Sequence, residues 1–208
     1  MNRREALQRV AMLIGGSVIG ANLFLEGCTR SASKDVATLF EKPSTDFLGD
    51  LAEAILPKTS TPGAKEAGVG EFIPVMIRDC YGEVDQKAFL EGLAGVDERA
   101  KKEFGKKFAE LSNEEKLKFV NDFDKEAKKY QEEKGAKQQT LNDEAVKKGG
   151  KAEDAEQLPN HFFTLLKQLT LTGFFTSEVG MTKALRYVKI PGKFDGNYPY
   201  KKGDRAFA

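Results

Sequence analysis

The sequence predicts an all-α protein, a single irregular helical domain with long loops and an extended C-terminal tail. Between residues 44 and 190 apolar residues recur at intervals of three and four, which is the spacing of helices that bury one face. No segment alternates apolar and polar residues in the way a half-buried strand does. With 40% hydrophobic and 31% charged residues in a chain of 208, the composition suits one folded domain.

The N-terminal residues 1–27 predict an export signal. Arg3 and Arg4 precede an apolar run over residues 10–25, which is shorter than the roughly 20 residues of a spanning helix. The adjacent arginines resemble a twin-arginine signal, which exports proteins that are already folded. The letters "LEGC" that follow resemble a lipobox and predict lipidation of Cys28; the alternative is a structural or disulfide-forming cysteine beside an ordinary cleavage site.

The mature chain is predicted to begin with a tether over residues 28–43, which are mostly small and polar and include a proline. The helical domain then covers residues 44–208. In "STDFLGDLAEAILP" a first helix is expected behind Ser44 or Thr45 as the cap, ending before Pro57. The following "KTSTPGAKEAGVG" is rich in Gly, Ser, Thr and Pro and predicts a loop long enough to suggest a function.

Three more helices are expected before the middle of the chain. The second lies in "EFIPVMIRDCY", with Pro74 tolerated if it occupies the first turn, and with Cys80 as a small buried hydrophobe. A third helix is expected from Asp85 to about Phe108. Ser112 and Glu115 form a capping box for the fourth. The buried stripe predicted for this fourth helix is Leu117, Phe119, Val120 and Phe123.

The remaining part of the chain divides into a polar and an apolar segment. Residues 131–157 have almost no large apolar side chains and predict a mobile polar insertion. A strongly apolar helix is expected after Pro159, interrupted at Gly173 and resumed behind Thr176 or Ser177. Beyond residue 190 the tail is expected to be extended coil lying on a surface.

The sequence offers no catalytic, cofactor-binding or metal-binding residues of its own. Basic and acidic residues number 33 and 32, with no basic face or arm for nucleic acid. The glycines of "GVGEF" lack the third glycine and the preceding strand of a dinucleotide site. His161 is the single histidine and is interpreted as a residue at a helix N-terminus, and Glu178 as part of a helix cap.

Two long blocks carry a family resemblance. They are "AILPKTSTPGAKEAGVGEFI", residues 54–73, and "LLKQLTLTGFFTSEVGMTKALRYVKIPGKFDG", residues 165–196. Together they resemble the small subunit of membrane-bound flavin sugar dehydrogenases, the gluconate 2-dehydrogenase subunit 3 family. The resemblance implies a non-catalytic subunit that binds a flavoprotein large subunit carrying FAD, with a cytochrome c subunit as electron acceptor. It also implies that this chain assists maturation and takes its partner through the Tat translocon to the periplasm, with membrane association through the complex or a lipid on Cys28.

The partner is expected to contact the loop at residues 57–70 and the segment at residues 174–200. Exposed glycines and aromatics in extended coil can adapt to a partner surface. The predicted interface residues are Pro62, Gly63, Phe175, Thr176, Ser177, Glu178, Gly180, Pro191, Gly192 and Tyr198. The alternatives are that these residues only close the helical core, that the chain is a free-standing helical envelope lipoprotein, or that it is an enzyme itself.

Overall fold

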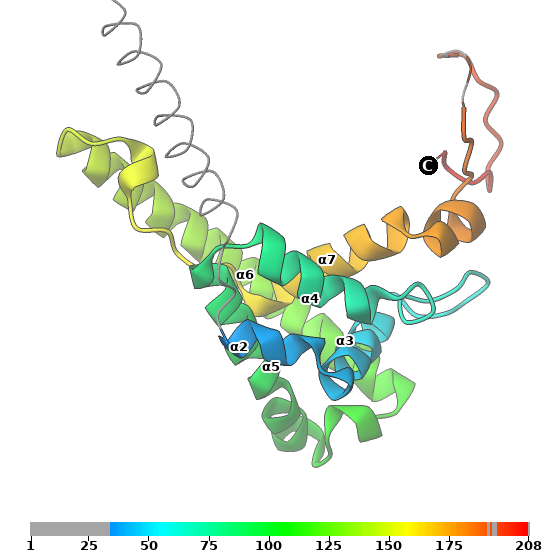
Figure 1. Ribbon diagram of the computed structural model, residues 1–208, viewed down its shortest axis with the longest axis horizontal. Helices are drawn as coiled ribbons and strands as arrows, with labels where there is room; N and C mark the ends of the chain where they lie inside the picture. Colours follow the sequence, from blue (N-terminus) through cyan, green and yellow to red (C-terminus); the bar gives the residue numbers. More distant parts are fainter. Residues whose placement is uncertain (1–33, 191, 193–194, 208) are drawn as a thin grey trace, which may run out of the picture. The chain divides into compact units, whose positions relative to one another are not determined.

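The computed structural model describes residues 34–190, 192 and 195–207, and this part of the chain is built from helices (Figure 1). Within these residues no β-strand forms, and a single bridge pairs Arg186 with Phe207. The predicted all-α class is therefore confirmed. Among the described helices, none combines the length and the apolar character needed to cross a bilayer. The predictions for Arg3, Arg4 and Cys28 lie outside the described residues.

The domain begins earlier than the sequence predicted. A short helix α2 (Lys34–Ala37) and a 3-10 turn (Thr38–Phe40) precede the first long helix. Val36 and Leu39 are buried in the core, at 0% and 1% exposure. The predicted tether over residues 28–43 is therefore wrong for its second half, because two apolar side chains are enough to fix a short polar segment to the core.

Helix α3 (Lys42–Ile55) also begins before its predicted cap. Pro43 lies in the first turn, where a backbone N–H has no helical partner and proline costs nothing. Glu41 occupies the N-cap position without a side-chain hydrogen bond, so neither Ser44 nor Thr45 is the cap. The C-terminal end before Pro57 is close to the prediction.

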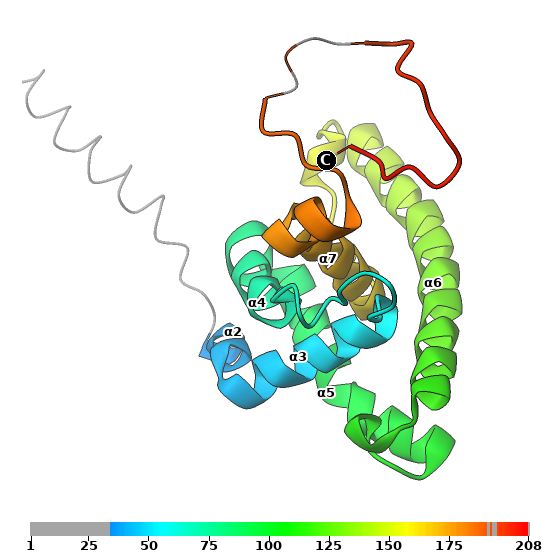
Figure 2. The same cartoon turned by 90° about the vertical axis from the view of Figure 1, so that its right-hand side faces the viewer.

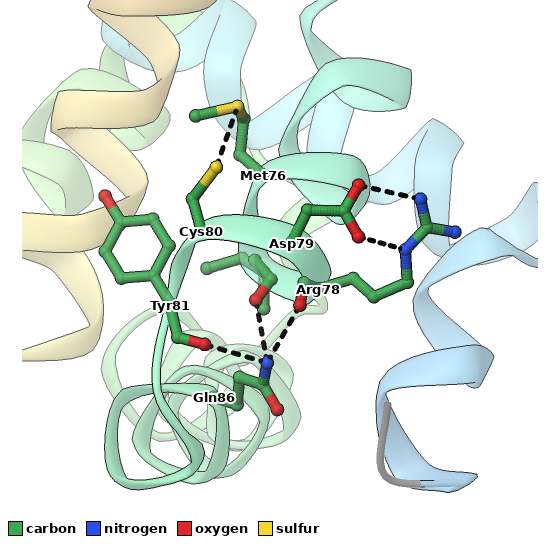
Figure 3. Close-up of polar contacts among 7 residues, drawn as sticks. Met76, Arg78, Asp79, Cys80, Tyr81 and Gln86 are labelled. Carbon is green, nitrogen blue, oxygen red and sulfur yellow. Dashed lines mark hydrogen bonds and ion pairs between the residues drawn. The ribbon is translucent and has the colours of Figure 1, made fainter. Parts of the chain in front are cut away.

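Helix α4 (Val69–Cys80) packs along α3. It begins at Val69, so Pro74 lies in the helix interior instead of in the first turn, and Pro74 is buried. Cys80 is the last residue of α4 and is exposed, which corrects its predicted burial. Its Sγ lies 4.0 Å from Sδ of Met76 (Figure 3).

The C-terminal end of α4 is capped from the next helix, α5 (Glu83–Phe104). Gln86, which is 5% exposed, donates from Nε2 to the carbonyl oxygens of Ile77, Arg78 and Tyr81 at 3.0, 3.2 and 3.0 Å (Figure 3). These carbonyls are at a helix end, where they have no partner within the helix. One buried amide therefore joins α4 to α5.

Helix α5 ends four residues earlier than predicted. Gly105 follows it in the left-handed region, at a φ of 73°, which favours glycine as the C-cap. A separate 3-10 turn, Phe108–Glu110, then leads to the next helix, and Phe108 is fully buried. The turn leaves room for Phe108 to reach the core, where its ring lies 5.5 Å from that of Phe119.

Helix α6 (Asn113–Lys147) starts with the predicted capping box. The Ser112 Oγ accepts from the Glu115 backbone N–H at 3.2 Å, and the Ser112 N–H donates to Glu115 Oε2 at 2.8 Å. Phe119, Val120 and Phe123 are buried as predicted, whereas Leu117 is 55% exposed, which corrects its predicted place in the stripe. Leu117 faces a depression of about 460 Å³ between α6 and the end of α3.

The polar residues 131–147, predicted as a mobile insertion, continue α6 as regular helix. The segment is rich in Glu, Lys, Gln and Ala, which favour helix even without an apolar face. Hydrogen bonds between side chains one turn apart support it, as from Gln139 to Asp143 at 2.9 Å. The low hydrophobicity of this segment correctly predicted that its side chains are exposed, but the segment is a regular helix and not a mobile insertion.

Helix α7 (Phe162–Thr176) crosses the other helices and holds the centre of the core (Figure 2). Gly173 does not interrupt it. A Cβ at Gly173 would lie 2.7 Å from Cδ1 of Phe72, so the glycine permits α4 and α7 to approach closely. The buried residues of α7 are Phe162, Phe163, Leu165, Leu166, Leu169, Thr170, Gly173 and Phe174.

Candidate partner interface

The loop between α3 and α4 is held in place by Glu53 of α3. The Glu53 carboxylate accepts the backbone N–H of Lys58 at 2.8 Å and that of Lys65 at 2.9 Å, so it joins the two ends of the loop. Gly63 is buried beside this carboxylate, and a Cβ there would lie 2.2 Å from Glu53 Oε1. Ala64 is fully buried. Gly63, a predicted interface residue, therefore has a structural role, while Pro62 next to it is half-buried.

The chain turns sharply after α7, and Ser177 organises the turn. Its Oγ donates to the Phe174 carbonyl at 2.7 Å and accepts the Gly180 N–H at 2.9 Å. Gly180 is buried, and a Cβ there would lie 1.9 Å from the same carbonyl oxygen. The Ser177 Oγ thus accepts the first N–H of the π-helical turn Gly180–Ala184, with which the helix predicted to resume after Gly173 ends.

Exposed apolar side chains lie at the end of α7. Leu171 and Phe175 are one turn apart on the same face, with 36% and 40% of their surfaces exposed. Thr176 and Glu178 beside them are also exposed. These four residues are exposed and can meet a partner, although the ring of Phe175 also packs edge to face against that of the core residue Phe174 at 5.1 Å. Leu171 was not predicted as an interface residue; its spacing of four from Phe175 was the available signal.

The described tail is exposed over its whole length and closes on itself at Arg186. The Arg186 N–H donates to the Ala206 carbonyl at 2.8 Å, and its Nη1 donates to the Tyr198 hydroxyl at 2.8 Å. The guanidinium lies 4.8 Å from the Phe207 ring centroid, and the rings of Tyr198 and Phe207 meet edge to face. The tail is therefore not laid on the helices as predicted, and Arg186, which sequence reasoning missed, is the residue that closes it.

Three predicted interface residues belong to the tail. Gly192 is exposed, with a φ of 75°, a left-handed conformation that favours glycine. Pro191 lies outside the described residues. Tyr198 is 46% exposed, and its hydroxyl and ring take part in closing the tail.

The structure brings the α3–α4 loop and the π-helical turn together at a shallow depression of about 380 Å³. The lining residues are Lys58, Thr59, Ser60, Thr61, Pro62, Glu66, Thr182, Lys183 and Arg205. Glu66 joins the two sides, with its carboxylate 2.9 Å from Lys58 Nζ and 3.8 Å from Lys183 Nζ. The hydrogen bond from Lys58 lowers the pKa of Glu66 below its ordinary value.

His161 takes the structural place that the sequence predicted. It is the N-cap of α7, and its Nδ1 accepts the Phe163 N–H at 3.2 Å. Its Nε2 lies 3.8 Å from Glu126, yet burial lowers the pKa of His161 below its ordinary value. In the part of the chain that the structure describes, no three His, Cys, Asp or Glu side chains gather as a metal site would require.

Comparison with known proteins gives one match. The family model described as "Gluconate 2-dehydrogenase subunit 3" matches residues 42–192, from the first turn of α3 to the start of the tail. No curated protein and no solved structure gives a significant match.

Proposed function

The chain belongs to the gluconate 2-dehydrogenase subunit 3 family, and from this premise we propose that it is the non-catalytic small subunit of a flavin-dependent sugar or sugar-acid dehydrogenase. The family match over residues 42–192 carries this proposal. FAD belongs to the large subunit in this proposal, and a cytochrome c subunit accepts its electrons. Without a cofactor of its own, the chain contributes by binding the large subunit.

The proposed role is to assist maturation, export and membrane association of the flavoprotein, which then works in the periplasm. The paired Arg3 and Arg4 support export through the Tat translocon, because that route carries folded proteins. A flavoprotein that binds FAD before export is such a protein. A lipid on Cys28 is the proposed membrane anchor.

The exposed end of α7 is the proposed contact with the large subunit. Leu171 and Phe175 stand on a helix whose opposite face is packed into the core, so they lose little conformational freedom on binding. Aromatic side chains held in this way are frequent anchors of protein interfaces. Thr176, Glu178 and the neighbouring loop with Pro62 provide polar surroundings for them.

Export is tested by expressing the large subunit with three forms of this chain. With the parent chain, the flavoprotein is expected in the periplasm with FAD bound. With Arg3→Lys/Arg4→Lys, which keeps the charge and alters the arginine pair, both proteins are expected to stay in the cytoplasm. A deletion is expected to give the same failure. A flavoprotein that is exported and loaded with FAD without this chain would overturn the role.

Binding is tested separately with Phe175→Asp. A charge in the proposed anchor is expected to weaken capture of the large subunit at least tenfold, because a buried unpaired carboxylate is costly. The matched control is Val84→Asp on α5, which places the same charge at a side chain that is 47% exposed. Equal loss in the two variants, or none in either, would exclude this face as the interface.

A further inference from the structure

The tail forms a closed loop, residues 186–207, which we call the C-terminal loop. Its described residues include five basic and two acidic side chains, a net charge of +3. The whole chain has a formal net charge of only +1. Positive charge is therefore concentrated in this loop.

Large apolar side chains stand out from the same loop. They are Tyr187, Val188, Ile190, Tyr198, Tyr200 and Phe207, and their exposed fractions run from 37% to 79%. None of them belongs to the hydrophobic core or packs against it. Figure 1 shows the loop standing away from α6 and α7 and returning towards the turn after α7. Ile190 and Tyr200, at 79% and 74%, are the most exposed of these side chains.

The mixture of residues favours a lipid surface over a protein surface. Lysine is depleted in protein interfaces, whereas three of the five basic residues of the loop are lysines, Lys189, Lys201 and Lys202. Lysine stems can lie along an apolar layer while the ammonium groups reach phosphate. Tyrosine is likewise suited to the boundary between acyl chains and headgroups.

The contacts of Arg186 close the C-terminal loop and so keep its aromatic and basic side chains in one region. Its contacts with Ala206, Tyr198 and Phe207 join the two ends of the loop, so the aromatic and basic residues are not spread along a free tail. An arrangement that is already closed loses less conformational entropy on binding.

We propose that the C-terminal loop binds the surface of a bilayer rich in anionic phospholipid, with Ile190 and Tyr200 entering the headgroup layer and Lys189, Lys201 and Lys202 facing the phosphates. The proposal does not depend on the dehydrogenase partner or on a lipid at Cys28. It gives the chain a second, reversible contact with a membrane, and weak single contacts become stable when two act together.

The absence of tryptophan from the sequence permits a direct test with the full chain. Tyr200→Trp introduces one tryptophan, whose emission reports on the loop and not on the N-terminal apolar segment. With vesicles of phosphatidylglycerol the emission maximum is expected to move to shorter wavelength, and with phosphatidylcholine it is expected to stay at its value in water. Added salt is expected to weaken the response, because it screens the attraction.

Charge variants identify the residues responsible. In the Tyr200→Trp background, Lys201→Ala/Lys202→Ala is expected to weaken binding to phosphatidylglycerol about thirtyfold, since each basic residue near such a surface contributes about 1 kcal/mol. The matched control, Lys147→Ala/Lys148→Ala, removes the same charge at the exposed end of α6 and is expected to leave binding unchanged.

The position of the probe is also controlled. Leu117→Trp places the tryptophan at an exposed site on α6, where no shift is expected. An emission shift that is equal for both probes, equal for both lipids, or seen only when the flavoprotein is added would overturn the proposal. The last outcome would assign the loop to an acidic protein surface.

Discussion

Two coil regions rich in glycine and proline, the α3–α4 loop and the C-terminal loop, differ in how they are attached to the helical core. The α3–α4 loop is attached to the core by Glu53, which accepts from both of its ends, and by the buried side chain of Ala64. The described residues of the C-terminal loop are closed by contacts within the loop, centred on Arg186. The difference shows that a coil segment is attached to the core when a neighbouring helix offers it a partner. The amino-acid composition of the coil does not reveal whether such a partner is present.

The connection from α6 to α7 resembles the α3–α4 loop, because side chains of neighbouring helices hold it. Asn160 donates its backbone N–H to Asp85 Oδ1 of α5 at 2.7 Å, and the Tyr130 hydroxyl donates to the Pro159 carbonyl at 3.1 Å. Gln138 Oε1 accepts the Leu158 N–H at 2.9 Å. This polar connection is thus held by side chains of two helices, and it should behave like the α3–α4 loop when those contacts are removed.

The largest effect is expected where the attached loop enters α4. Gly70→Ala places a Cβ 2.4 Å from the Thr45 carbonyl and 2.9 Å from the Gly49 nitrogen, both of which are backbone atoms. The helices must separate, so the free energy of unfolding is expected to fall by about 2–3 kcal/mol, measured by urea denaturation. Gly95→Ala is the control, since nothing lies within 4 Å of its Cβ, and it should stabilise α5 slightly. Equal effects of the two variants would contradict the close crossing.

A smaller effect is expected from releasing the loop itself. Glu53→Ala removes the acceptor of two backbone N–H groups, which should lower the free energy of unfolding by about 1–2 kcal/mol. Limited proteolysis should then cut within residues 57–67. Glu66→Ala removes another carboxylate of the same loop, but only from exposed ion pairs, and should change stability less. Proteolysis that is unchanged by Glu53→Ala would show that Glu53 is not needed to hold the loop.

A modest pH dependence is expected from the connection before α7. Burial lowers the pKa of His161 in the folded protein, so the unfolded chain, with a histidine pKa of about 6.5, takes up the proton first. Stability should therefore fall as the pH drops below about 6.5 and level off below the lowered pKa. His161→Asn keeps an N-cap acceptor and cannot titrate, so its urea midpoint should change less between pH 7 and 5.5. The same slope in both proteins would remove His161 as the cause.

The smallest effect on global stability is expected at the C-terminal loop. Arg186→Ala opens the loop, yet the free energy of unfolding should stay within about 0.5 kcal/mol, because none of the described residues of the loop belongs to the core. Chymotrypsin should cut faster after Tyr200. Arg205→Ala removes the same charge without those stacking contacts and should leave cleavage unchanged. A large loss of stability in Arg186→Ala would mean that the two coil regions are not different after all.

Much of the fold could be predicted from local patterns. The capping box of Ser112 and Glu115 and the apolar stretch of α7 depend on residues within a few positions of one another, and both were located correctly. The errors arose where the local sequence pattern does not determine burial or regular structure. Leu117 has helical spacing and yet is 55% exposed, because it lines the depression between α6 and the end of α3. The polar residues 131–147 lack a buried face and are helical nonetheless.

The candidate interface was predictable only in part. Within the two predicted segments, the sequence could not distinguish Gly63 and Gly180, which are buried against Glu53 and Phe174, from Phe175 and Glu178, which are exposed. It also gave no indication that Arg186 would meet Phe207, because 20 intervening residues separate them in the sequence and only the folded chain places them together.

By itself, then, the sequence determined the helical class, most helix positions and the family, because these follow from periodicity, capping and ordered blocks of residues. Tertiary structure decided which coil belongs to the core and which glycines are needed for close approach. Burial and long-range contact depend on the side chains that a neighbouring helix provides. The sequence of the α3–α4 loop does not show that Glu53 of α3 will bind it, and the sequence of the C-terminal loop does not show that its apolar side chains will stay exposed.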